Sequence, residues 1–568
     1  MKRASQIFFQ ISVYNILWLL LCLLMPTLLF FVGISVQRWQ LPACALLAAG
    51  GMYLLTGRKK PTAAAVFGWL AMVVLAVLLS YLIFNIHWDG NTYHKTAIGL
   101  LTDGWNPVRG SCIDVLPEAY RTLGIAYNAR WVDHYANGGW VVSAVFASFF
   151  GNIETGKAVN LLILLSAAGI VQRCLSVYLK RRGWVAAITA AAVLQPAVVS
   201  QIESYYIDGN LYLYLLLGVA AMLMLGVKNS AFPRRYPLLF LFASIVYCIN
   251  VKFTGAVYIG MFGVGFFICW LIRAAKEHRF AKVFVSAGSM FAGMALFAVL
   301  VVGNSSYVSN LIDHGNPLYP LFGEGKVDIM AYSEPHTFEN KNNFQKSLVS
   351  FFGKTENITN RDERGPTLKV PFTFSLSEIR ACMYTDVRIG GAGPFYSGIF
   401  LVSAVFAVFF LVRCARKQPY LALEAGVTLT LALLMALFLP GSWWARYSAY
   451  LHFFVIAALL YLAKRREESE SLAIRCMSGV FGSVIFFNAA CFLLSPAAGV
   501  YLSREIWRQK EQMQRHKEIV VYADPAQMTG IFWNLEDWGV VYRVSETKIE
   551  GSSVFRGHLI FKSIENEE

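Results

Sequence analysis

The stretch NIHWDGNTYHKTAIGLLTDGWNP, from Asn85 to Pro107, begins where a long apolar run stops. It places acidic, basic and hydroxyl side chains directly after a segment long enough to cross a bilayer. It also carries Trp88 and Trp105, and indole rings favour the membrane–water interface. The stretch therefore predicts a functional loop at a membrane surface, with Asp89 as its first carboxylate.

The composition fits such a surface. The chain has 568 residues, of which 57% are hydrophobic and only 15% are charged. A soluble core cannot bury that much apolar surface, so we expect an all-α polytopic membrane protein. The formal net charge of +15 could indicate nucleic acid in a soluble protein. Here the cations lie in short clusters between apolar runs, which is typical of membrane topology and not of nucleic-acid binding.

About thirteen apolar segments are candidates to cross roughly 30 Å of hydrocarbon as helices. They are residues 16–36, 39–55, 62–86, 158–179, 184–201, 207–227, 237–251, 253–272, 283–303, 394–412, 419–439, 447–463 and 472–494. The sequence thus divides into a transmembrane domain, 1–495, and a tail, 496–568.

Basic clusters recur on every second connection, as at Arg58 to Lys60, Lys180 to Arg182 and Arg413 to Lys417. Because cytoplasmic loops are enriched in Lys and Arg, we expect a cytoplasmic N-terminus. The large loops 87–157 and 304–393 and the tail then lie on the outer, extracytoplasmic face. Cys112 and Cys382, the two cysteines in these loops, could pair as a disulfide there.

The tail differs in kind from the rest. Residues 519–523 and 539–544 favour strands, with a helical stretch between them, and His558 to Lys562 could add another strand. We expect a small α/β appendage, too short to bury much core unless it packs on the membrane domain.

Several residues in the outer segments are candidates for chemistry. Carboxylates occur at Asp89, Glu203 and Asp208, and Tyr93 and His94 share the first loop. Cations that could hold an anion are Arg446, and as alternatives Arg388, Lys95 and Lys252. Plainer interpretations stay open. Asp89 and Asp208 could cap helices, Arg446 could extend to lipid headgroups, and Gly390, Gly391 and Gly393 could form a tight turn.

Several of these residues fall in short motifs that resemble those of a known protein family. The sequence TrpAspGlyAsnThrTyrHis, residues 88–94, resembles a Trp-Asp-x-x-x-Tyr-His motif of bacterial members of the GT-C superfamily of membrane glycosyltransferases. GlyAsnProLeuTyrPro (315–320), ArgIleGlyGlyAlaGlyPro (388–394) and AlaArgTyr (445–447) are similar to later motifs of that group. Protein O-mannosyltransferases and aminoarabinose transferases belong to it. The resemblance covers the layout of the membrane region and excludes the tail.

The resemblance implies a GT-C-like bundle that moves a sugar from a polyprenyl-phosphate donor to a glycan, lipid or protein acceptor. Such a reaction needs a general base and a cation at the departing phosphate. We expect Asp89 and Asp208 to be catalytic, with Asp89 as the base. Arg446, Arg388, Tyr93, His94, Lys95 and Glu203 would contact substrate.

No cofactor is evident. Asp208 and Glu203 could either orient the acceptor or join Asp89 around a divalent cation, Mg²⁺ or Mn²⁺. An Asp-x-Asp pair, found in metal-dependent members of the superfamily, is missing from the second outer turn. Two rival functions remain. A polysaccharide polymerase or ligase uses the same lipid-linked substrates. A flippase or transporter usually places charges near the bilayer midplane, where this sequence has little beyond Glu424.

Overall fold

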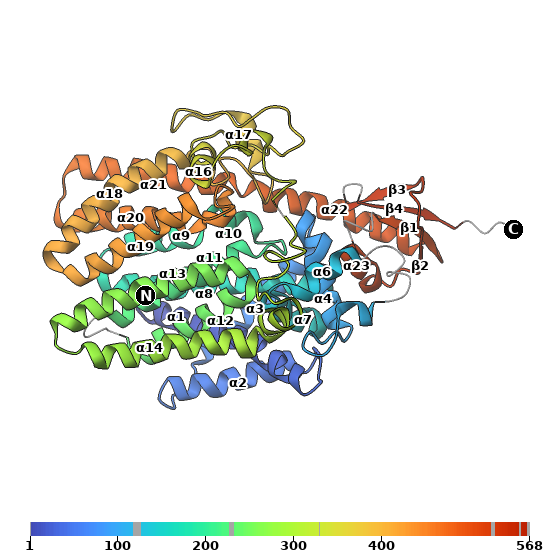
Figure 1. The fold of residues 1–568 in the computed structure, drawn as a ribbon, viewed down its shortest axis with the longest axis horizontal. Coiled ribbons are helices and arrows are strands. Elements are labelled where there is room, and N and C mark those ends of the chain that lie inside the picture. The colour runs from blue at the N-terminus through green and yellow to red at the C-terminus, as the bar shows by residue number, and fades with distance from the viewer. Residues whose placement is uncertain are drawn as a thin grey trace.

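The computed structural model describes residues 2–116, 126–226, 232–328, 330–523, 529–555 and 558–564. Helices dominate, and most run side by side along the longest axis of the molecule (Figure 1). Among the described residues, ten helical segments are long and apolar enough to cross a membrane. The chain is therefore a multi-pass, mainly α-helical membrane protein with a small C-terminal sheet.

The ten segments are built from the following elements: α1 (Lys2–Phe31), α3 (Ala63–Leu82), η3 (Ile153–Lys157) with α8 (Ala158–Tyr178), α11 (Asp208–Gly226), α13 (Phe253–Lys276), α14 (Phe280–Phe297) with η4 (Ala298–Val302), α18 (Tyr396–Lys417), α19 (Pro419–Phe438), η7 (Ala445–Leu451) with α20 (His452–Glu468), and α21 (Leu472–Cys491) with α22 (Leu494–Gln514). Long-range packing joins α1 to α8, α11 to α12, and α18 to α20.

Three of the thirteen expected spans are shorter helices: α2 (Gln40–Leu55), α9 (Arg182–Val193) and α12 (Arg235–Val251). At 1.5 Å per residue, each is shorter than the roughly 30 Å hydrocarbon layer. The expected helix 184–201 breaks because Pro196 begins a separate helix, α10 (Pro196–Gln201). The residue before a proline disfavours helical backbone, and the Gln195 side chain caps the new helix.

The expected spans 237–251 and 253–272 meet at a single extended residue. Lys252 has φ −165° and ψ 137°, so α12 ends and α13 begins on either side of it. The backbone is therefore not helical at Lys252. Because of this break, the Lys252 side chain reaches the neighbouring helix α11 and does not follow the surface of α12.

The two long connections contain short helices. Residues 87–157 form η1 (Gly90–His94), α4 (Lys95–Thr102), η2 (Cys112–Val115), α6 (Ala126–His134) and α7 (Gly138–Phe150). Residues 304–393 form η5 (Asn304–Val308), α15 (Ser309–His314), η6 (His336–Phe338), α16 (Asn343–Phe351) and α17 (Leu376–Ala381). The possible disulfide between Cys112 and Cys382 is not present, since both cysteines are free. Cys382 packs with Cys491 and Phe492.

The tail forms the expected appendage at one end of the bundle, which we call the sheet end (Figure 1). Strands β1 (Ile519–Ala523), β2 (Tyr542–Val544), β3 (Ser552–Val554) and β4 (Leu559–Ser563) form a sheet in the order β2-β1-β4-β3, with η8 (Thr529–Ile531) and α23 (Phe532–Asp537) between β1 and β2. β1 pairs parallel to β2 and antiparallel to β4. The strand at 519–523 and the additional strand near 558–562 are confirmed.

The appendage does not stand alone. The ring of Trp533 lies against Gly99 of α4, where an added Cβ would come within 2.2 Å of it. Its Nε1 donates to Asp103 Oδ2 at 2.9 Å, and Asn534 donates to Glu154 Oε1 at 3.0 Å. The small sheet thus completes its core by docking on the membrane domain.

Candidate active site

Asp89 lies in the turn that leads from α3 into η1, seven residues after α3 ends, and its own backbone is helical. The turn is held by reciprocal bonds, since Asn85 Nδ2 donates to Asn91 Oδ1 and Asn91 Nδ2 donates to the Asn85 carbonyl, both at 3.1 Å. Gly90 is needed there, because a Cβ would lie 2.3 Å from the Asn85 amide. Asp89 precedes η1 without a side-chain capping bond. Its carboxylate is therefore not consumed as a helix cap.

The carboxylate of Asp89 meets Arg446 instead. Arg446 Nη1 lies 3.1 Å from Asp89 Oδ2 and 3.6 Å from Asp208 Oδ2. The arginine side chain is only 9% exposed, so it does not extend to lipid headgroups. One guanidinium thus bridges two carboxylates that come from different segments of the chain.

Asp208, the first residue of α11, has a second cation. Lys252 Nζ lies 2.6 Å from Asp208 Oδ1, and both side chains are buried. The extended backbone at Lys252 places this amine beside α11. Both carboxylate oxygens of Asp208 thus face a cation. Removing one partner of such a buried ion pair lowers the stability of the fold. Asp208 is therefore a positioning residue for Arg446 in this arrangement.

Trp444 supports the cationic side of the site. The guanidinium carbon of Arg446 lies 4.1 Å from the centre of a Trp444 ring, and that of Arg388 lies 5.0 Å from it. The Nε atoms of both arginines are buried without a hydrogen-bond partner among the described residues. Since guanidinium groups match phosphate oxygens, two donors near one indole are suited to an anion.

Close glycine packing positions Arg446. A Cβ on Gly391 would lie 2.1 Å from the Val387 carbonyl and 3.1 Å from the Ala445 Cβ. Gly390 and Gly393 have φ of +55° and +113°, in the region that favours glycine. The glycine-rich segment is a tight turn that packs against the residue preceding Arg446.

Tyr93 and His94 line the same region. The Trp140 indole donates to His94 Nδ1 at 2.6 Å, so this histidine has a partner on α7. Burial lowers the pKa of His94 to about 4, which leaves it neutral at pH 7. Burial also raises the pKa of Tyr93 well above its usual value, with the Asp89 charge adding to the rise. Both side chains are thus uncharged at pH 7 and lie beside Asp89.

Lys95 and Glu203 lie in a different network. Lys95 and Lys157 both pair with the fully buried Glu154, and Lys95 Nζ donates to Asn534 Oδ1 at 2.7 Å. Burial lowers the pKa of Lys95 to about 8. Burial raises the pKa of Glu203 to about 7, and its charged neighbours are Lys157 and Glu154. The structure does not bring these two residues to Arg446.

A divalent cation does not fit the cluster as built. Arg446 lies between Asp89 and Asp208, and Lys252 occupies the other oxygen of Asp208. Within the described ranges, no three His, Cys, Asp or Glu side chains gather as they would around a metal ion. The charge balance that a metal would supply comes from the two basic side chains.

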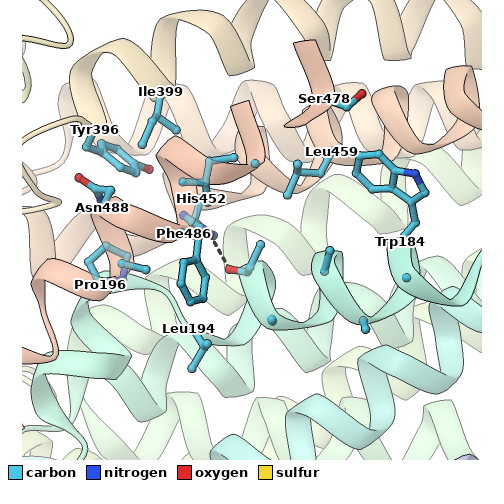
Figure 2. Close-up of a pocket in the computed structure, with 18 of the residues that line it drawn as sticks. Trp184, Leu194, Pro196, Tyr396, Ile399, His452, Leu459, Ser478, Phe486 and Asn488 are labelled. Atoms are coloured by element: carbon cyan, nitrogen blue, oxygen red, sulfur yellow. Dashed lines mark hydrogen bonds between the residues drawn. The ribbon is translucent and has the colours of Figure 1, made fainter. Parts of the chain in front are cut away.

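A separate apolar groove lies within the helix bundle. Its volume is about 760 Å³, and α9, α18, α20 and α21 form its walls. Figure 2 shows Trp184 and Ser478 towards one end, Pro196, Tyr396 and Asn488 towards the other, and Phe486 between them. His452 binds the Ala191 carbonyl at 2.8 Å, so even this polar wall residue has a partner.

A small second pocket lies at Arg446. It holds about 10 Å³ and is lined by Gln195, Ala197, Asp386 and Arg446 among others. Gln195 and Ala197 flank Pro196, which lines the groove. The α9–α10 break thus contributes residues to both cavities, and Arg446 lines the small pocket.

Sequence reasoning placed Asp89, Asp208 and Arg446 on one face, and the structure joins them. It gave Lys252 only as an alternative and missed Trp444 and Asp386. The signal for Lys252 was present, because a lone lysine between two apolar runs marks a break between helices. Comparison with protein-family models and with curated proteins finds no match for this chain.

Proposed function

We propose that this protein is a membrane glycosyltransferase that moves a sugar from a polyprenyl-phosphate donor to an acceptor. The observation that carries the proposal is the position of Arg446, between Asp89 and Asp208 in a small pocket that shares the α9–α10 break with an apolar groove. A base, a phosphate-binding cation and a lipid-sized groove are the parts that this reaction needs.

The groove suits the lipid part of the donor. Its walls are mainly apolar side chains, and it opens among helices that are long enough to lie in the bilayer. A polyprenyl chain there would gain hydrophobic and dispersion contacts. The phosphate would then lie near the small pocket, within reach of the unpaired Nε groups of Arg446 and Arg388.

The reaction balances with these residues. The acceptor oxygen or amide nitrogen forms a bond to the anomeric carbon while the bond from that carbon to the phosphate oxygen breaks. The electron pair leaves on the polyprenyl phosphate, which Arg446 and Arg388 hold. The acceptor proton passes to Asp89, and general-base help of this kind contributes about 10² to 10⁴ in rate.

In the resting site, Arg446 also keeps the Asp89 carboxylate from acting as a base. In the structure its guanidinium contacts Asp89 Oδ2, and the pocket beside it is small. An arriving phosphate would compete for the guanidinium and draw it from Asp89, so the base becomes available only when the donor is bound. Lys252 keeps Asp208 neutralised during this exchange.

The proposed topology places the Asp89 site, the loops 87–157 and 304–393 and the tail on the extracytoplasmic face. It keeps thirteen crossings of a bacterial inner membrane with the N-terminus in the cytoplasm, and so it requires the shorter helices α2, α9 and α12 to cross together with the residues that flank them. The turns between α13 and α14 and between α18 and α19, which are rich in Lys and Arg, lie at the end of the bundle opposite the sheet end (Figure 1). The positive-inside rule assigns that end to the cytoplasm.

The test is sugar transfer by purified protein in lipid nanodiscs, with a radiolabelled polyprenyl-phosphate sugar and membrane extract as acceptor source. The native protein should transfer label, and D89N should not. Transfer by D89N at the native rate would remove Asp89 from the base role. Failure of the native protein with a panel of donor sugars would contradict the proposed function.

A further inference from the structure

A third cavity, which we call the loop cleft, lies beside the site but outside the helix groove. It encloses about 750 Å³ between residues 354–384 and α22. Its lining includes His87, Lys354, Glu356, Arg380, Tyr384 and Tyr501. This volume falls within the usual range for ligand pockets.

The loop cleft approaches the site along two short stretches of backbone. His87 is two residues before Asp89, and Tyr384 is two residues before Asp386. The His87 ring bonds Thr385 Oγ1, with 2.7 Å to Nδ1, and thereby ties the two stretches together. Thr385 itself lines the small pocket with Arg446. The His87–Thr385 bond therefore links the lining of the loop cleft to the lining of the small pocket that contains Arg446.

The charges in the cleft leave a cationic surplus. Glu356 pairs with Arg364 at 3.3 Å, and Glu378 pairs with Lys369. Glu378 also accepts from the Thr355 amide at 3.1 Å. Lys354 and Arg380 are exposed, and neither makes an ion pair within the part of the chain that the structure describes. Both carboxylates are therefore neutralised while two cations remain unpaired.

Two aromatic rings complete the lining. Tyr384 is 48% exposed and Tyr501 is 73% exposed. A tyrosine ring presents an apolar face and a polar tip, so it can pack on a sugar ring and still bind its hydroxyls. Unpaired cations with exposed tyrosines are a combination suited to a sugar that carries negative charge.

We propose that the loop cleft binds the acceptor, and that this acceptor is an anionic glycan, a sugar chain that carries carboxylate or phosphate groups. Lys354 and Arg380 bind the anionic groups, and Tyr384 and Tyr501 contact the sugar rings. The end of the chain nearest His87 then presents its hydroxyl to Asp89. This assignment rests on the proposed function, because it treats the bound glycan as the acceptor.

Binding can be measured without any donor, so its outcome is separate from whether the protein transfers sugar. The full chain in phosphatidylcholine nanodiscs is titrated with tetragalacturonic acid, a carboxylated oligosaccharide, and with maltotetraose, a neutral one of equal length. The native protein should bind the anionic sugar about tenfold more tightly, as expected for charge-assisted hydrogen bonds. K354Q/R380Q should lose that preference.

A matched control is K326Q/R515Q, which removes the same charges at exposed positions outside the cleft and should bind like the native protein. Equal native affinity for the two sugars overturns the proposal, as does an unchanged preference in K354Q/R380Q. A second set of nanodiscs contains phosphatidylglycerol. If these lipids abolish binding of tetragalacturonic acid, the cleft is a lipid-headgroup site and the proposal also fails.

Discussion

Arg446 Nη1 lies 3.1 Å from Asp89 Oδ2, although 357 positions separate the two residues in the chain. The contact joins the connection after α3 to the start of η7, and the same guanidinium atom lies 3.6 Å from Asp208 Oδ2. The predictions below test the parts of this arrangement separately.

Removing the Asp89 charge should stop catalysis while leaving the fold intact. We expect D89N to lower the transfer rate about 10² to 10⁴-fold, because an amide cannot accept the acceptor proton. The measurement is kcat with saturating donor. D313N, at an exposed position, is the matched control and should keep native activity. Equal losses in D89N and D313N would mean that the effect is not specific to the site.

Replacing Arg446 by lysine keeps the charge but loses the planar fork. We expect R446K to bind the polyprenyl-phosphate donor about tenfold more weakly, since lysine cannot hold phosphate and Asp89 with the same geometry. Donor titration in nanodiscs measures the effect. R475K changes an exposed arginine of α21 and should bind normally. Native donor affinity in R446K would leave Arg446 with a purely structural role.

Metal chelation should have no effect. Arg446 and Lys252 already engage the carboxylate oxygens of Asp89 and Asp208, so no divalent cation is needed to balance them. We expect transfer to persist after dialysis against EDTA and to gain nothing from added Mg²⁺ or Mn²⁺. A loss on chelation that Mn²⁺ restores would contradict the charge assignment.

Glu203 should make the protein less stable as pH rises. Burial raises its folded-state pKa from the model-compound value of 4.5 to about 7, so the folded state favours the neutral acid. The contribution of protonated Glu203 to the free energy of unfolding is fully present below about pH 4.5. It is lost as the pH rises to about 7. Ionised Glu203 then costs at most about 3 kcal/mol. The melting temperature of E203Q should exceed that of the native protein increasingly between about pH 5 and pH 8.

Asp537 also contributes to the pH dependence of stability, because burial raises its pKa to about 7. Asp537 is present in both the native protein and E203Q, so the difference between their melting temperatures reports on Glu203 alone. E324Q, a change at an exposed position, should melt with the native protein at every pH. A constant difference between E203Q and the native protein across this range would show that Glu203 does not titrate as described.

The appendage should detach when its docking contact is lost. In G99V, the new side chain would overlap the Trp533 ring, where even a Cβ comes within 2.2 Å. We expect limited proteolysis to cleave this variant near residue 515 much faster than the native protein. G260A is the control, because a Cβ there meets nothing within 4 Å. Equal cleavage rates in G99V and the native protein would contradict the docking.

Much of the fold follows from local sequence. Apolar runs long enough for the bilayer determine the helices, because backbone groups in lipid must bond within the segment. The β-branched and aromatic residues at 519–523 favour a strand, and the structure has β1 there. The polar stretch after α3 likewise identified Asp89 as a candidate before any contact was known.

What local sequence could not decide depends on distant contacts. It did not show that Lys95 belongs to the Glu154 network, since Asn534 and Glu154 come from far along the chain. It did not show that Cys382 packs on Cys491. It could suggest that Asp89, Asp208 and Arg446 share a face, but only tertiary packing, including that of α11 on η7, brings both carboxylates within 4 Å of the Arg446 guanidinium. Distances of that kind arise from the whole bundle, because each side chain is placed by the helices on which its own helix packs.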